Sequence, residues 1–171
     1  MIVRAERAED NDVIAAVVEA AFGSPDEARL VEGFRASAGY LPELALVAEE
    51  DGEVVGHVMF TLTELDDGTT ILMLSPLAVR PDRQRTGIGS ALVREGLRLS
   101  AERSEPLVIV EGNPLYYSRF GFVAASELGL ERPYEQIPEA AFQAQPLPAY
   151  VEQARGRVLY PPPLTPYYEA L

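Results

Sequence analysis

The 171-residue chain has no lysine, no cysteine and no tryptophan, and its single histidine is His57. The lack of lysine excludes a Walker-A phosphate loop, a pyridoxal Schiff base and a lysine nucleophile. The lack of cysteine excludes a thiol nucleophile, a redox pair, an iron–sulfur cluster and a disulfide. One histidine cannot build a multi-histidine zinc site, and no G-x-S-x-G segment supports a serine triad. The sequence therefore predicts no metal cofactor.

Negative charge dominates the composition, with 27 Asp and Glu against 14 arginines and a formal net charge of −13. Nucleic acids and anionic membranes need a cationic protein surface, so we expect neither as a partner. No apolar run approaches the ~18 residues of a membrane-spanning helix, and the N-terminus has no signal-peptide hydrophobic region. We therefore expect one soluble, cytoplasmic domain over residues 1–171.

Hydrophobic periodicity and turn residues predict helices and strands in a mixed order. Helices are expected over Asp10–Phe22, from a capping box at Ser24 to Gly39, over Gly87 to about Arg103, and over Pro114–Phe120. Strands are expected over Met1–Ala5, Leu44–Glu50, Glu53–Thr63, Thr69–Val79, Leu107–Val110, Phe122–Ala124 and Ala141–Gln145. The strand that begins at Leu107 is expected to run parallel to the one that ends at Val79. The proline-rich tail is expected to wrap over the surface.

The sharpest local feature is the segment Gln84-Arg85-Thr86-Gly87-Ile88-Gly89-Ser90, which follows a strand and opens a helix. Free N–H groups at a helix N-terminus attract anions, and glycines let an anion approach the backbone closely. The pattern therefore indicates a phosphate or pyrophosphate cradle. Arg80, Arg83 and Arg85 lie close by and would offset the acidic surface. The alternative is an ordinary helix start, and Leu92 at the third glycine position argues against a dinucleotide fingerprint.

Two segments of the sequence resemble known signatures. Leu77-Ala78-Val79-Arg80-Pro81 followed by Gln84-Arg85-Thr86-Gly87-Ile88-Gly89 is similar to the acetyl-CoA motif, Q/R-x-x-G-x-G/A, of the GNAT superfamily of N-acetyltransferases. Tyr116-Tyr117-Ser118-Arg119-Phe120-Gly121-Phe122 is similar to its aromatic-Tyr-x-x-x-Gly-Phe segment and resembles a mostly uncharacterised bacterial branch. The resemblance covers residues 1–125 well, and 126–171 loosely. It implies an α+β fold whose central, mostly antiparallel sheet contains a splayed parallel strand pair and is flanked by helices.

The resemblance also implies that acetyl-CoA is the acetyl donor. The backbone of Leu77 and Val79 would pair with the pantetheine arm as an added strand. N–H groups of the glycine segment would hold the pyrophosphate, and Gln84 would position that segment. The implied cofactor-binding set is Leu77, Ala78, Val79, Gln84, Arg85, Thr86, Gly87, Ile88, Gly89, Ser90, Asn113 and Tyr116.

The implied reaction is direct transfer of an acetyl group to a primary amine. Tyr117 occupies the motif position of the general acid, because a phenol of pKa ~10 can protonate a thiolate whose thiol has a pKa of ~8.5; the alternative is a buried aromatic ring. Many relatives carry a Glu as the base on the strand before the glycine segment, but Thr70–Val79 contains no carboxylate. Glu111 at the end of the next strand is the substitute base, with a solvated charge as its alternative role. A water chain, or an amine that arrives deprotonated, would remove the need for a base. His57 is expected to be a satisfied strand histidine, and Arg119 a local cap.

Two other functions remain open. One alternative is a non-catalytic acyl-CoA-binding or interaction module on the same fold, which the missing strand carboxylate would suit. A weaker alternative is a different phosphate-ligand enzyme that uses the same segment. The acceptor is expected to be a small molecule or a peptide, and the acidic surface suits a polyamine, an amino sugar or a basic peptide end. The protein is expected to be a monomer or a homodimer.

Overall fold

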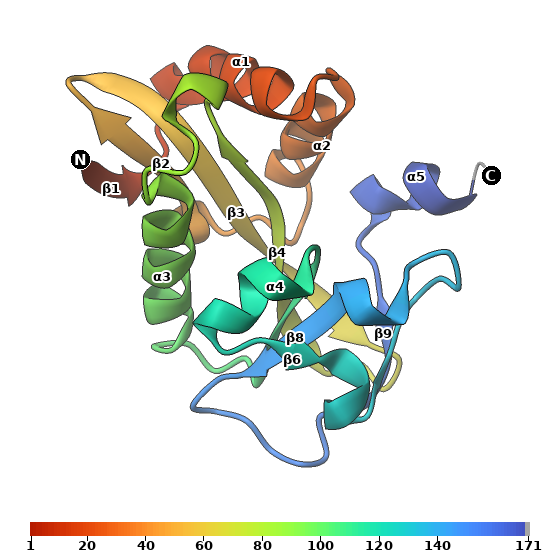
Figure 1. Cartoon of the computed structure of the whole chain (residues 1–171). Helices are drawn as coiled ribbons and strands as arrows, with labels where there is room; N and C mark the ends of the chain where they lie inside the picture. The colour runs from red at the N-terminus through yellow and green to blue at the C-terminus, as the bar shows by residue number, and fades with distance from the viewer. Residues whose placement is uncertain (170–171) are drawn as a thin grey trace. The chain divides into compact units, whose positions relative to one another are not determined.

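The computed structural model of the chain describes residues 1–169 (Figure 1). These residues divide into two compact units. The first comprises Met1–Phe60 with Ser75–Leu99, and the second comprises Thr61–Leu74 with the described residues from Ser100 onward. The long strands β3 (Glu53–Leu65) and β4 (Thr70–Val79) each run through both units. Neither unit is therefore a continuous stretch of chain, and the expectation of a single domain stays a prediction.

The first unit combines antiparallel strands with helices. Its elements besides β3 and β4 are β1 (Ile2–Ala5), α1 (Asn11–Phe22), α2 (Asp26–Arg35), β2 (Ala45–Glu50) and α3 (Ile88–Ser100). β1 pairs with β2, and β2 pairs with β3, both antiparallel. Asp51 and Gly52 form the turn between β2 and β3 with positive φ angles, as the Asp-Gly pair predicts.

Two glycines let α3 pack closely against β3 in the first unit. A Cβ on Gly56 would lie 3.0 Å from side-chain atoms of Ile88 and Leu92, and a Cβ on Gly96 would collide with the ring of Phe60. Ile88 and Leu92 are themselves buried. The helix that follows the glycine-rich segment is thus fixed to the sheet through its first turns.

The second unit contains a parallel strand pair. Its elements besides β3 and β4 are β5 (Leu107–Glu111), α4 (Pro114–Tyr117), β6 (Val123–Ala124), β7 (Leu130–Glu131), β8 (Phe142–Pro146), β9 (Gly156–Leu159) and α5 (Thr165–Glu169). β4 runs parallel to β5, with Leu72 opposite Val108 and Leu74 opposite Val110. β8 pairs antiparallel with β5 and with β6, β9 pairs antiparallel with β3, and β7 runs parallel to β9. The expected α+β fold with a mostly antiparallel sheet and a parallel pair is confirmed.

Several details differ from the expected elements. α2 begins at Asp26, and Ser24 Oγ accepts a hydrogen bond from the Asp26 N–H at 3.2 Å, so the capping box is wrong. α3 ends at Ser100, three residues before the expected end. Local sequence patterns do not reveal β7, β9 or α5, because these elements span only two to five residues and depend on distant partners.

Candidate active site

The glycine loop, residues 84–90, joins β4 to α3 in the first unit. The backbone enters the left-handed region at Arg85 (φ 63°) and Gly87 (φ 92°), just before α3 begins at Ile88. Gly87 is exposed, and a Cβ built on it would meet no atom within 4 Å. The loop is therefore open beside the helix start.

Backbone donors at this helix start have no protein partner. Within residues 1–169, the N–H groups of Gly87, Ile88, Gly89 and Ser90 donate to no protein acceptor. The first hydrogen bond of the helix runs from the Ala91 N–H to the Gly87 carbonyl at 3.0 Å. Four such N–H groups at a helix N-terminus, beside an open glycine, form a suitable site for an anion.

Side-chain hydrogen bonds hold the loop against the end of β4. Gln84 Nε2 donates to the Val79 carbonyl at 3.0 Å, and Thr86 Oγ1 donates to the Arg83 carbonyl at 2.6 Å. Both bonds close short turns, so the conformation that presents the N–H groups is set by the loop's own residues. Neither bond uses the side chain of Arg85.

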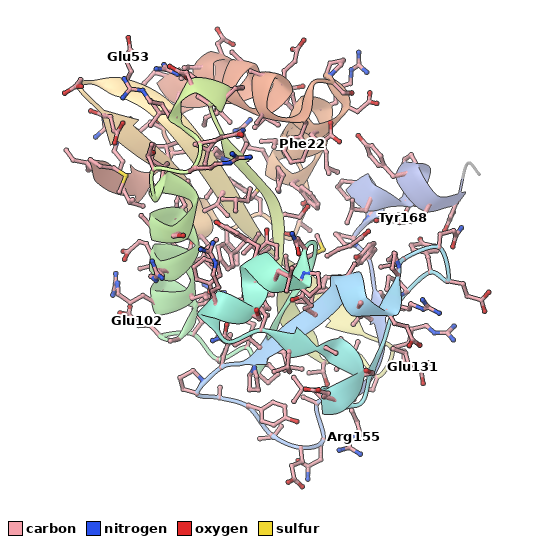
Figure 2. All side chains as sticks on the ribbon, in the orientation of Figure 1. Phe22, Glu53, Glu102, Glu131, Arg155 and Tyr168 are labelled. Carbon is pink, nitrogen blue, oxygen red and sulfur yellow. The ribbon has the colours of Figure 1, made fainter. Side chains whose placement is uncertain are left out.

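The three arginines near the loop are not equally available. Arg80 binds Asp82 at 2.6 Å and Glu53 at 3.0 Å. Glu53 lies at the tip of the β2–β3 hairpin (Figure 2). Arg83 lies 3.4 Å from Glu50. Arg85 is exposed and, among the described residues, forms no ion pair. The local positive charge is therefore weaker than the count of three arginines suggests.

The end of β4 presents alternate side chains to different surroundings. Leu77 and Val79 are half-buried, whereas Ala78 between them is 2% exposed. The ladder between β4 and β5 covers Leu72–Leu74, and β4 continues to Val79. The expected pairing of this strand end with a pantetheine arm stays a prediction, and one lone pair of the Val79 carbonyl already accepts the Gln84 amide.

Tyr117 lies at the end of α4 in the second unit and is 8% exposed. Its ring packs edge-on against Tyr116 and Phe122, at centroid distances of 5.0 and 5.6 Å. Burial, with a smaller contribution from Tyr116, raises the pKa of the Tyr117 phenol above its ordinary value. Its hydroxyl makes no hydrogen bond to any described residue. The hydroxyl oxygen is not fully buried.

The residues around Tyr117 have local structural roles. The Asn113 side chain caps α4 by accepting a hydrogen bond from the Leu115 N–H at 3.0 Å. Arg119 donates to the Tyr116 carbonyl at 3.2 Å and lies over the Tyr116 ring, 4.5 Å from its centroid. The expected local role of Arg119 is confirmed. The expected cofactor contacts of Asn113 and Tyr116 stay predictions.

Glu111 ends β5 in the second unit and holds two tyrosines from the C-terminal tail. Its Oε2 accepts hydrogen bonds from the Tyr160 hydroxyl at 2.8 Å and from the Tyr168 hydroxyl at 2.5 Å. Burial, then the negative charge of Glu111, raises the pKa of Tyr160, and burial, then the hydrogen bond to Glu111, raises that of Tyr168. Tyr168 stacks on Tyr134 at a centroid distance of 4.7 Å. The carboxylate is thus an anchor for the tail, a role that sequence reasoning missed.

The predicted site residues fall into two groups. Leu77, Ala78, Val79 and residues 84–90 belong to the first unit, whereas Glu111, Asn113, Tyr116 and Tyr117 belong to the second. Sequence reasoning missed Gly112, which contacts the Tyr117 ring. It also missed the bonds of Tyr160 and Tyr168 to Glu111, because these tyrosines lie far from Glu111 along the chain.

His57 belongs to a buried polar cluster in the first unit. Its Nε2 lies 2.8 Å from Glu6 Oε2, and the side chains of Arg35 and Tyr40 also donate to Glu6. Burial opposes ionisation of Glu6, but these hydrogen bonds outweigh it and lower its pKa to about 2. His57 Nδ1 is buried without a partner among the described residues. The expectation of a satisfied histidine is therefore confirmed for one ring nitrogen only.

Residues 1–169 contain no group of three or more His, Asp or Glu side chains arranged to hold a metal ion. In that same part of the chain, no helix is long and apolar enough to cross a membrane. The expected cytoplasmic location stays a prediction.

Known proteins are similar to this chain over most of its length. The family model described as "Acetyltransferase (GNAT) domain" matches residues 42–124. YjhQ of Escherichia coli, named an uncharacterized N-acetyltransferase, is 34% identical over 156 residues, which cover 87% of this chain and 86% of YjhQ. The crystal structure of the E. coli GNAT family N-acetyltransferase YhbS in complex with CoA has a TM-score of 0.86 at 30% identity and covers 96% of this chain and 91% of its own.

A second solved structure gives the same result. A GNAT family acetyltransferase from Brucella melitensis, in complex with acetyl-CoA, has a TM-score of 0.78 at 31% identity and covers 95% of this chain and 97% of its own. Sequence and structure relatives thus agree over nearly the full length of each protein, and the matched family region contains both motifs. The chain therefore belongs to the GNAT family of acetyltransferases.

Proposed function

We propose that the protein transfers an acetyl group from acetyl-CoA to a primary amine. The observation that carries this proposal is the row of four N–H groups without protein partners beside the open Gly87, in a chain of the GNAT family. A pyrophosphate has the charge and the acceptor oxygens that such a helix start attracts. The related structures of YhbS and of the Brucella protein hold CoA and acetyl-CoA.

The residues of the first unit would hold the donor. N–H groups of the glycine loop bind the pyrophosphate, and the backbone of Leu77 and Val79 binds the pantetheine arm. Gln84 keeps the loop and the strand end together through its bond to Val79. Arg85, exposed and without an ion pair in the described chain, adds positive charge beside the phosphates. The thioester, when bound, supplies the acetyl group and a thiol leaving group.

Tyr117 and Glu111 are the proposed residues for proton transfer. The Tyr117 phenol is protonated near neutral pH, and burial, which raises its pKa, makes it a weaker acid. In this proposal it therefore donates its proton only as negative charge develops on the leaving sulfur. The attacking amine must lose one proton. Glu111 Oε2 is engaged by two phenols, but Oε1 makes no hydrogen bond to any described residue. We therefore propose Oε1 as the proton acceptor, directly or through water, and solvent as the source that reprotonates Tyr117.

Acetyl-CoA binding tests the proposal, because a ligand that binds the native state raises the midpoint of thermal unfolding. A Gly87→Val substitution places a branched side chain at a positive φ on the open side of the N–H groups. We expect it to abolish the shift caused by acetyl-CoA. Gly52→Val is the matched control, since Gly52 also has a positive φ and open surroundings but lies in the β2–β3 turn.

Each variant is compared with its own ligand-free midpoint, because a branched residue at a positive φ strains the fold in both cases. The control should keep the full shift. Equal shifts in the two variants, or no shift in the unchanged protein at saturating acetyl-CoA, would contradict the assignment of the loop.

A non-catalytic acyl-CoA-binding module is the second candidate. It is favoured by the absence of a carboxylate on β4 and by the engagement of Glu111 with Tyr160 and Tyr168. Release of CoA thiol over a panel of primary amines separates the two functions. A catalyst releases thiol with at least one amine class, whereas a binding module shows the thermal shift and no release.

A further inference from the structure

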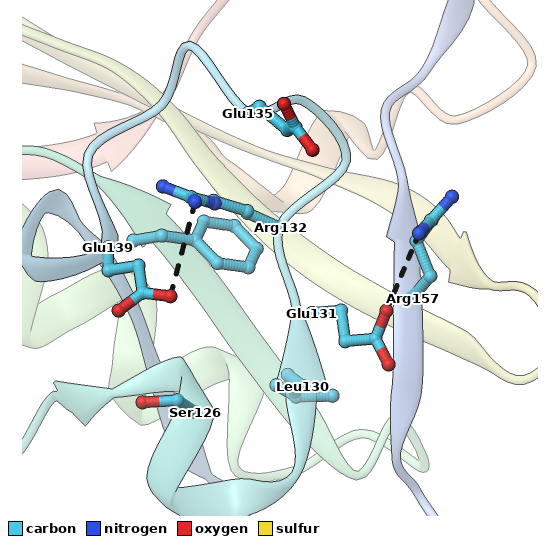
Figure 3. A pocket seen from close by; sticks show the side chains of 8 residues that line it. Ser126, Leu130, Glu131, Arg132, Glu135, Glu139 and Arg157 are labelled. Carbon is cyan, nitrogen blue, oxygen red and sulfur yellow. Dashed lines mark ion pairs between the residues drawn. The ribbon is translucent and has the colours of Figure 1, made fainter.

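A cavity of about 280 Å³ lies in the second unit, lined by β7, β8, β9 and the loop after β7 (Figure 3). Leu130 and Phe142 give it an apolar floor, and each is only 3% exposed. None of its lining residues belongs to the glycine loop or to the segment around Tyr117. The cavity is therefore additional to the residues used in the proposed function.

One guanidinium of the cavity is fixed and still has donors to spare. Arg132 Nη1 donates to the Ile137 carbonyl at 2.6 Å, which holds the side chain in place. Its Nη2 lies 4.0 Å from Glu139, a side chain that is 79% exposed. An ion pair this long and this exposed is weak, so Arg132 can accept a better-placed carboxylate.

The carboxylates of the cavity are not equally paired. Glu131 lies 3.6 Å from Arg157, and both side chains are more than half exposed. Glu135, on the loop after β7, also lines the cavity, and its side chain makes no ion pair or hydrogen bond within residues 1–169. Figure 3 shows Glu135 and Arg132 on the same loop segment. The cavity thus combines a guanidinium with free donors, an unpaired carboxylate and an apolar floor.

We infer that this cavity binds a small zwitterion of the α-amino-acid class. Arg132 pairs with the ligand carboxylate, Glu135 pairs with its ammonium group, and an apolar side chain rests on Leu130 and Phe142. A purely cationic ligand would face Arg132 and Arg157, and a purely anionic ligand would face three carboxylates. The volume suits a molecule of one amino acid rather than a long polyamine.

Three matched probes test this inference in the full-length protein: L-phenylalanine, 2-phenylethylamine and 3-phenylpropionate. All three share the aromatic ring. L-Phenylalanine carries both charges, 2-phenylethylamine carries only the positive charge, and 3-phenylpropionate carries only the negative charge. We expect calorimetry to show that L-phenylalanine binds at least about tenfold more tightly than either analogue, because a charged hydrogen bond is lost with each missing group.

Variants of the two charged residues should separate the two ends of the ligand. Glu135→Gln should lower the affinity for L-phenylalanine about tenfold and leave the affinity for 3-phenylpropionate unchanged, whereas Arg132→Gln should lower the affinity for both. Arg132→Lys keeps the charge and should retain part of the affinity. Glu152→Gln removes an exposed carboxylate outside the cavity and should change nothing.

The shift of the thermal unfolding midpoint caused by acetyl-CoA is measured on the same samples. It should be equal in all variants, since the glycine loop is intact. Failure of the inferred site is thereby distinguished from failure of the proposed acetyl transfer. The inference is overturned if L-phenylalanine does not bind at millimolar concentration or if the three probes bind with equal affinity. It is also overturned if neither Glu135→Gln nor Arg132→Gln weakens the binding of L-phenylalanine.

Discussion

Gly112 and the ring of Tyr117 are in direct contact. A Cβ on residue 112 would lie 2.5 Å from Tyr117 Cε2 and 3.1 Å from Cδ2, which is too close for the ring to stay in place. The backbone cannot easily move away, because the Gly112 N–H donates to the Ala141 carbonyl at 2.9 Å and its carbonyl accepts from Gln143 Nε2 at 3.2 Å. Gly112 therefore sets the position of the proposed general acid.

A Gly112→Ala substitution should displace the ring and lower turnover at saturating substrates by ten- to a hundredfold, since small misplacements of reacting groups are costly. The thermal shift with acetyl-CoA should persist. The test is a double-mutant cycle with Tyr117→Phe, scored by thiol release. If Gly112 acts through the hydroxyl, the double variant is no slower than Tyr117→Phe alone; additive losses would contradict a positioning role.

Tyr117→Phe removes the hydroxyl and keeps the ring contacts. We expect turnover to fall about 10²-fold, the lower end of the range for general acid–base catalysis. The free energy of unfolding should change by less than about 1 kcal/mol, because the hydroxyl bonds to no described residue. Thiol release and urea unfolding measure the two effects. Unchanged turnover across the pH range would remove Tyr117 from the chemistry and favour the binding module.

Short-range patterns explain how much of this site was predictable. The glycine-rich start of α3 depends on neighbours within a few residues, so residue type and spacing predict it. The parallel pairing of β4 with β5 follows from a strand–helix–strand order. These local features also carry the family resemblance.

Long-range partners explain what was not predictable. Glu111 meets Tyr160 and Tyr168 across 49 and 57 residues, and Arg80 meets Glu53 across 27. No local pattern records such a meeting, so Glu111 reads as a free carboxylate and Arg80 as a free cation. The two errors have one cause, because a charge is visible in sequence whereas its partner depends on the fold.

The Glu6 cluster should make the first unit sensitive to acid. The pKa of Glu6 is about 2 in the folded protein and 4.5 in its ordinary state, so its ionised form stabilises the fold above pH 4.5. That contribution is lost as the pH falls from 4.5 toward 2, and it amounts to about 3 kcal/mol. Urea unfolding between pH 5 and pH 2 measures it.

Other carboxylates also titrate in this range, so the comparison is made with variants. Glu6→Gln should be destabilised at pH 7, since Arg35 loses its partner, and should show a shallower loss of stability in acid. Glu19→Gln, which removes an exposed carboxylate from α1, should keep the steep loss. Parallel pH profiles for Glu6→Gln and the unchanged protein would show that Glu6 is not the titrating group.

Tyr168 should control the attachment of α5 in the second unit. Its hydroxyl donates to Glu111, its ring stacks on Tyr134, and its carbonyl accepts a bond from Gln136 at 3.4 Å. Tyr168→Phe removes only the bond to a charged acceptor, worth about 1.5–3 kcal/mol, so amide exchange in the peptide that contains α5 should become at least about tenfold faster.

Hydrogen-exchange mass spectrometry measures this, with Tyr150→Phe as the control, because the Tyr150 hydroxyl bonds to no described residue. The pKa of Tyr168 is raised, so the phenol keeps its proton below pH 10 and the difference between the variants should be the same at pH 6 and pH 8. Equal exchange in both variants would mean that contacts other than the bond to Glu111 hold α5, and that Glu111 is free for another role.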